Sequence, residues 1–166
     1  MVPIQQILDW VERLKGLPYI FGTEQDGRDN PTAEDCSEMV QNACDMNGVV
    51  PEMPDGAIYQ MRHCRANGAL ITIDEAIKTP GALLFRISQD LGNHVVFSLG
   101  NGMTFEARGR AYGVGSWPAT GRVWTHACLI PGVDYSDKEN QNVRFSTFGN
   151  HHGHKPGSSG SNGPWY

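Results

Sequence analysis

The sequence predicts an α+β domain, because helical periodicity dominates its first half and alternating strand patterns dominate its second half. Consecutive strands with a turn signal at Asn101-Gly102 favour an antiparallel sheet. The composition is that of a globular chain, with 39% hydrophobic and 19% charged residues. A chain of 166 residues is long enough to bury one core without disulfides or a metal.

Three helices are predicted in the first half. Apolar residues recur every three to four positions over 3–15, and a second such pattern covers 36–47. The second helix would begin at Asp35-Cys36-Ser37, where the N–H groups of the first turn have no helical partners. A short third helix is expected over 56–65, and the polar segment 22–34 is expected to be a long loop.

Four strands are predicted in the second half, and two of them form a hairpin. If three residues make its turn, with Gly102 in the left-handed conformation, Phe97 faces Phe105. In that register His94 and Glu106 share one face of the sheet and lie diagonal to each other. A two-residue turn would shift the register by one and place Glu106 on the opposite face. The expected strands are 82–87, 93–99, 103–107 and 123–130.

The charge pattern excludes some classes of partner. A net charge of −5, with acidic side chains concentrated in 24–55, argues against nucleic acid, which requires a basic face. The sequence contains no run of 18 apolar residues, so no membrane span is predicted. Residues 1–15 lack the basic start and continuous apolar core of a signal peptide. We therefore expect a monomer made in a cytoplasm, with no nucleic-acid or membrane partner.

One cysteine and one histidine are candidates for nucleophilic catalysis. Cys36 falls at a helix N-terminus, where the helix dipole favours the nucleophilic thiolate over the thiol. A cysteine nucleophile needs a base, and His94 would stand at the rigid start of a strand. Glu106 could accept the second ring N–H of His94 and stabilise the imidazolium. The remaining cysteines are expected to be free, buried core residues: Cys44, Cys64 and Cys128.

Four segments in this order resemble the NlpC-type cell-wall cysteine peptidases. They are Gly16-Leu17-Pro18-Tyr19 with Gly22, Asp35-Cys36-Ser37, the segment 80–85, and His94-Val95 with a polar residue twelve positions after His94. The resemblance covers about residues 4–132. It implies a small papain-like α+β fold, with N-terminal helices packed on a central antiparallel sheet. It also implies hydrolysis of amide bonds in peptidoglycan stem peptides, without a cofactor.

The resemblance implies a role for each matching residue. Cys36 would be the nucleophile, His94 the base, and Glu106 the third residue that orients His94. Tyr19 would lie near the nucleophile and bind the oxyanion together with the Cys36 N–H. Family members more often carry His, Asn or Gln in place of Glu106, and Gly in place of Glu38.

Three further residues have two interpretations each. Asp35 and Ser37, which flank the nucleophile, would either contact a stem-peptide amine or only cap the helix. Arg108 shares the predicted face of Glu106. It would either pair with a substrate carboxylate or neutralise Glu106.

The end of the chain has the composition of a flexible linker or tail. Residues 149–166 are rich in Gly, Ser, Asn and His, and they would follow a peptidase domain over 1–148. The segment His151–His154 is expected to bind no metal, because metal sites need ligands on a fixed frame. Together with 106–115 and 130–135, this organisation resembles the N-terminal peptidase domains of phage endolysins, in which further domains follow the linker. Hydrolysis of peptidoglycan would then serve host lysis.

Two other classes of function remain open from the sequence. An acyltransferase or thioesterase on the same fold would use the same residues, and only its substrates would differ. A non-catalytic cell-wall-binding module would keep the fold without the reaction. The presence of Cys36, His94 and Glu106 in register argues against the binding module.

Overall fold

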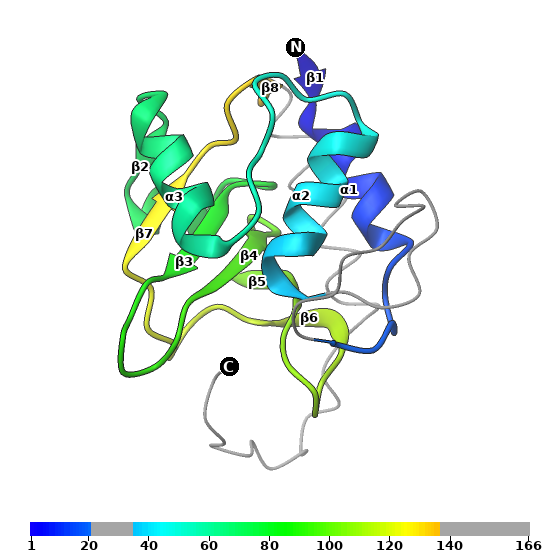
Figure 1. Cartoon of the computed structure of the whole chain (residues 1–166), viewed down its shortest axis with the longest axis vertical. Helices are drawn as coiled ribbons and strands as arrows, with labels where there is room; N and C mark the ends of the chain where they lie inside the picture. Colours follow the sequence, from blue (N-terminus) through cyan, green and yellow to red (C-terminus); the bar gives the residue numbers. More distant parts are fainter. Residues whose placement is uncertain (21–34, 137–166) are drawn as a thin grey trace.

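Residues 1–20 and 35–136 are described by the computed structural model of the chain (Figure 1). Within these ranges the helices are α1 (Ile4–Glu12), α2 (Cys36–Met46), α3 (Ala57–Ala66) and α4 (Ile73–Ile77). The strands are β1 (Val2–Pro3), β2 (Leu70–Ile71), β3 (Leu83–Arg86), β4 (His94–Ser98), β5 (Met103–Ala107), β6 (Val114–Pro118), β7 (His126–Cys128) and β8 (Val133–Asp134). None of these helices is long and apolar enough to cross a membrane.

The strands form one large antiparallel sheet and one small pair. The large sheet has six strands in the order β2-β7-β3-β4-β5-β6, so that β3 and β4 are central. The short strands β1 and β8 pair in parallel and bring the two ends of the described chain together. The predicted α+β class, with helices packed on a central antiparallel sheet, is confirmed.

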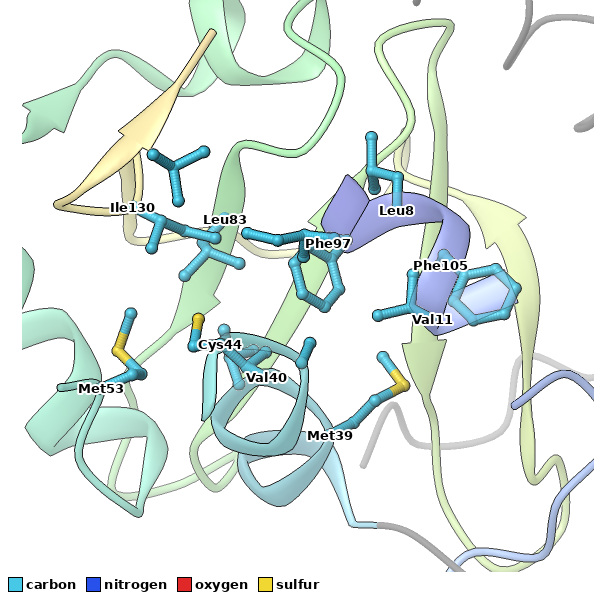
Figure 2. Packing of buried hydrophobic residues seen from close by; sticks show 14 of the residues in the cluster. Leu8, Val11, Met39, Val40, Cys44, Met53, Leu83, Phe97, Phe105 and Ile130 are labelled. Atoms are coloured by element: carbon cyan, nitrogen blue, oxygen red, sulfur yellow. The ribbon is translucent and has the colours of Figure 1, made fainter. Parts of the chain in front are cut away.

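The core lies between the sheet and the first three helices. α1 and α2 lie against one face of the sheet, and α3 packs beside β7 (Figure 1). Fully buried side chains from α1, α2 and the strands meet there, including Leu8, Met39, Phe97 and Phe105 (Figure 2). The other face of the sheet is covered by the short α4, in a smaller cluster around Leu84. This arrangement holds the first turn of α2 against β4.

Local sequence signals explain where α2 begins and ends. The Asp35 carboxylate accepts a hydrogen bond from the Glu38 N–H at 2.8 Å, which satisfies one of the unpaired donors of the first turn. The helix ends at Met46, and Gly48 follows with a φ of +70°, a conformation that favours glycine. The predicted helix over 36–47 is therefore confirmed, and those over 3–15 and 56–65 correspond to α1 and α3.

The predicted strands are confirmed except at the end of the chain. Of the expected strand 123–130, only His126–Cys128 pairs in the sheet. Before it, the Thr125 N–H donates to the Phe85 carbonyl at 2.7 Å, and the Trp124 indole donates to the Ala119 carbonyl at 2.9 Å. Five described elements were not predicted. The strands β1, β2 and β8 have only two residues each, α4 is five residues long, and β6 contains a glycine and ends on a proline.

Two predicted segments lie outside the described residues. They are the loop 22–34 and the tail 149–166, which includes His151–His154. The division of the chain into 1–148 and 149–166 stays a prediction.

Gly81 allows α1 to pack against the start of β3, which gives a test of the fold. Its φ is +82°, and a Cβ atom at this position would clash with the side chain of Ile4. We expect Gly81→Ala to lower the free energy of unfolding by roughly 2–4 kcal/mol, from the left-handed backbone and from overpacking together. Gly48→Ala, at a φ of +70° with open space around it, should cost only about 1 kcal/mol. Denaturant melts of both variants provide the measurement, and equal losses would contradict the close approach of α1.

Candidate active site

Cys36 is the first residue of α2, and its thiol points at the start of β4. Backbone groups of Val95 and Ser37 hydrogen-bond the thiol. Val95 directly follows His94, so the candidate nucleophile lies beside the strand that carries the candidate base. Cys36 is 8% exposed, so a small part of its surface reaches solvent.

His94 and Glu106 are brought together by the hairpin of β4 and β5. Phe97 faces Phe105 and Ser98 faces Thr104, which is the register expected for a three-residue turn. His94 Nε2 lies 3.0 Å from Glu106 Oε1, and both side chains are buried. An ionised carboxylate only accepts hydrogen bonds, so Nε2 carries the ring proton. Nδ1 is then the nitrogen that remains to take a proton from a nucleophile.

Arg122 binds the same carboxylate, and the sequence analysis missed it. Its guanidinium donates to Glu106 Oε1 at 2.6 Å and to Oε2 at 2.8 Å, a bidentate ion pair. The Thr104 hydroxyl lies within hydrogen-bonding reach of both Oε2 and the Trp117 carbonyl, and its single proton serves one of these acceptors at a time. The Glu106 carboxylate therefore has donors on both oxygens, and its orientation is fixed.

Solved structures provide a comparison for this arrangement. The NlpC/p60 domain of the peptidoglycan hydrolase SagA superposes with a TM-score of 0.61 at 22% identity, over 78% of this chain and 100% of that domain. The P60 domain of an antigen from Mycobacterium avium subspecies paratuberculosis gives 0.61 at 27% identity, over 76% of this chain and 93% of that one. The peptidoglycan hydrolase RipB from Mycobacterium tuberculosis gives 0.60 at 26% identity, over 77% of this chain and 64% of RipB. The chain has the NlpC/P60 fold. No family model and no curated protein sequence matches it.

In this NlpC/P60 fold, burial and the ion pair between Arg122 and Glu106 determine which protonation states Glu106 and His94 adopt. Burial opposes ionisation of Glu106, but hydrogen bonds from Arg122 and His94 outweigh it and hold the pKa of Glu106 well below its usual range. Burial lowers the pKa of His94, the charges of Arg122 and Arg86 lower it further, and Glu106 offsets only part of this. His94 is therefore neutral at pH 7, as a general base must be.

Burial opposes the expected stabilisation of a Cys36 thiolate. Burial raises the pKa of the Cys36 thiol to about 12, and the charge of Asp35 adds to the effect. The N–H groups of Val95 and Ser37 lower it, but by less than burial raises it. A helix N-terminus favours the thiolate, yet here desolvation is the stronger influence. Cys36 and His94 thus rest as a neutral thiol and a neutral imidazole.

The other residues expected at the site are also close to it. Tyr19 is half-buried, and its pKa is raised by burial and then by the charges of Cys36 and Asp35, which places its hydroxyl near both. Asp35 caps α2 and also accepts from the Ser37 hydroxyl at 3.3 Å, so the capping interpretation is observed for this pair. Any contact of Tyr19, Asp35 or Ser37 with substrate stays a prediction.

Arg108 lies near Glu106 without being its bidentate partner. Its guanidinium stacks over the Tyr112 ring at 4.3 Å and the Trp117 ring at 5.2 Å. Burial lowers the pKa of Arg108, while the negative charge of Glu106 raises it, so the two charges interact. The neutralising role that the sequence offered for Arg108 therefore falls mainly to Arg122, and the pairing of Arg108 with a substrate carboxylate stays a prediction.

The three remaining cysteines lie together in the core, as buried free thiols. Cys44 comes from α2, Cys64 from α3 and Cys128 from β7. Burial and a hydrogen bond with Cys64 raise the pKa of Cys128 well above its usual value. Among the described residues no group of His, Cys, Asp or Glu could hold a metal ion.

A pocket of about 330 Å³ lies beside the connection that leads into β4. It is formed between α3 and the connection from β3 to β4, which ends at Asn93, the residue before His94. The connection is fixed internally, since the Asn93 side chain accepts from the Ser88 N–H at 3.1 Å. The pocket is lined by Ile58, Ile87, Ser88, Gln89, Gly92 and Asn93.

The raised thiol pKa predicts how Cys36 reacts with iodoacetamide. Since only the thiolate reacts, the alkylation rate should rise about tenfold per pH unit and show no plateau below pH 10. The rate is measured from pH 6 to 10 by mass spectrometry of the modified peptide. In Cys36→Ala the buried Cys44, Cys64 and Cys128 serve as controls and should stay unlabelled. A plateau near pH 7 would mean that a thiolate–imidazolium pair already exists at rest.

Proposed function

We propose that this chain is a cysteine endopeptidase that hydrolyses amide bonds in bacterial peptidoglycan stem peptides. The observation that supports it most is the contact of His94 with Glu106 beside Cys36, at the start of α2. The fold adds support, because SagA and RipB, which share it, are peptidoglycan hydrolases.

The acylation step follows from the neutral resting state. Cys36 Sγ attacks the carbonyl carbon of the scissile amide while His94 Nδ1 takes the thiol proton. The new charge on His94 is stabilised by Glu106, whose carboxylate accepts a hydrogen bond from the Nε2–H group, with 3.0 Å between Nε2 and Oε1. The oxyanion of the tetrahedral intermediate receives hydrogen bonds from the Cys36 N–H and the Tyr19 hydroxyl. His94 then gives its proton to the leaving amine, and an acyl-enzyme thioester remains on Cys36.

Water completes the cycle. His94, now neutral, removes a proton from water, and the resulting hydroxide attacks the thioester carbonyl. The carboxylic acid product leaves, and Sγ regains its proton from His94. Since His94 protonates the leaving amine, the amine half of the substrate lies on its side of Cys36.

Sequence features alone support a proposal for the biological setting of this reaction. The segments 106–115 and 130–135 resemble phage endolysin peptidase domains, and 149–166 has the composition of a linker. We therefore propose that the reaction serves phage-driven lysis of the host cell wall.

Replacement of the nucleophile tests the proposed reaction. We expect Cys36→Ala to reduce release of stem-peptide fragments from purified peptidoglycan at least about 1,000-fold, because covalent attack is lost. The fold should survive, since the change removes one sulfur atom at the edge of the core. Mass spectrometry of the digest identifies the bond cut, as a new amine paired with a new carboxylate.

The matched control is Cys44→Ala, on the same helix but inside the core. This variant should melt at a lower temperature and still cleave at close to the parent rate. Cleavage by Cys36→Ala within tenfold of the parent would exclude Cys36 as the nucleophile. A parent that binds peptidoglycan without releasing fragments would favour a non-catalytic wall-binding module instead.

A further inference from the structure

Arg122 is a buried charge that pairs with Glu106. Its side chain is 3% exposed, and both of its terminal nitrogens bind Glu106. It comes from the connection between β6 and β7, remote in sequence from Cys36 and His94. Burying a guanidinium is costly unless it is paired and hydrogen-bonded. An arginine placed there needs an explanation beyond packing.

The surroundings of Arg122 fix the guanidinium in one orientation. Its guanidinium carbon lies 4.7 Å from the centre of the Trp124 ring, and the Trp124 indole is tied to the Ala119 carbonyl at 2.9 Å. On the other side, the two hydrogen bonds to Glu106 are 2.6 and 2.8 Å long. A continuous series of contacts thus runs from the β6–β7 connection through Arg122 and Glu106 to the His94 ring.

The charges around His94 show what this series of contacts changes. They are Glu106 on β5, Arg86 on β3 and Arg122, with the Cys36 thiol at the start of α2. Alone, a buried Glu106 carboxylate would hold His94 as an imidazolium, which cannot accept the thiol proton. Arg122 cancels that charge by direct pairing, yet it leaves Oε1 available to the Nε2 proton.

We propose that Arg122 is a positioning residue for the reaction: it fixes the Glu106 carboxylate against the His94 ring and balances its charge, so that His94 and Cys36 rest in their neutral forms. Arg122 touches neither substrate nor the reacting atoms. Its effect on the position of the His94 ring passes through Glu106, and its positive charge also acts on His94 directly. This inference rests on the proposed function, but its effect on the protonation of His94 is independent of any substrate.

The test combines kinetics with the titration of His94. We expect Arg122→Met to lower kcat on a soluble stem peptide roughly 10 to 100-fold with KM little changed. The NMR titration midpoint of His94 should rise by about one pH unit, because a positive neighbour is lost and Glu106 is no longer balanced. Arg122→Lys, which keeps the charge without the planar fork, should fall between parent and Arg122→Met in both measurements. Arg62→Met, which removes an exposed arginine stacked on Tyr59, is the matched control and should change neither.

A double variant isolates the path through Glu106. In a Glu106→Gln background, adding Arg122→Met should change kcat by less than about twofold, because the charge that Arg122 balances is already gone. This pair also stays informative if Arg122→Met alone fails to fold, since removing both charges leaves no unpaired buried ion. The proposal would be overturned if Arg122→Met lowered kcat by the same factor in the parent and in Glu106→Gln. It would also be overturned if the NMR titration midpoint of His94 did not move in Arg122→Met. A parent without hydrolysis would refute the proposed function, whereas the His94 midpoint would still decide the role of Arg122.

Discussion

The buried carboxylate of Glu106 is the interaction on which the arrangement of the site depends. A fully buried negative charge is unstable in a protein interior unless donors surround it. Here Arg122, Thr104 and His94 supply them, from three different places in the chain. Because every one of these contacts is directional, the carboxylate fixes the ring of His94 as well as its tautomer. The rest of the fold places the Cys36 thiol where the His94 ring can take its proton.

Two features of the fold place the thiol. The Asp35 side chain caps α2, so the helix begins at Cys36. The packing of α2 on the sheet then holds its first turn against β4, where Val95 contacts the thiol. The same burial that gives this precision raises the pKa of the thiol. The site therefore relies on His94 as a base during attack, rather than on a thiolate formed in advance. Desolvation of Cys36 raises the pKa of its thiol by more than the groups at the helix N-terminus lower it.

Features set by local sequence could be predicted, and features set by distant contacts could not. The diagonal pairing of His94 with Glu106 depends on the length of one hairpin turn, so the alternation of side chains predicted it for a three-residue turn, which is the turn observed. The start of α2 was equally local, since Asp35 and Cys36 carry the signal. Arg122 lies after β6, a strand that its glycine and proline concealed, so nothing local pointed to it.

The direction of the shift in the pKa of the Cys36 thiol was also set by distant contacts. A helix N-terminus is visible in the sequence, whereas the burial of Cys36 results from the packing of α2 against β4 and is not. The cluster of Cys44, Cys64 and Cys128 was also hidden, because the three residues come from separate elements that meet only in the folded core. The individual prediction of buried, free thiols was nevertheless confirmed.

The protonation of the His94 ring in the resting protein tests the central claim most directly. The two ring nitrogens can be followed by ¹⁵N NMR on histidine-labelled protein, with His94 assigned from the spectrum of His94→Gln. At pH 7 the account predicts a neutral ring, with the proton on Nε2 facing Glu106 and an unprotonated Nδ1. An imidazolium at pH 7, or a neutral ring with its proton on Nδ1, would contradict the claim that the paired carboxylate holds His94 ready as a base.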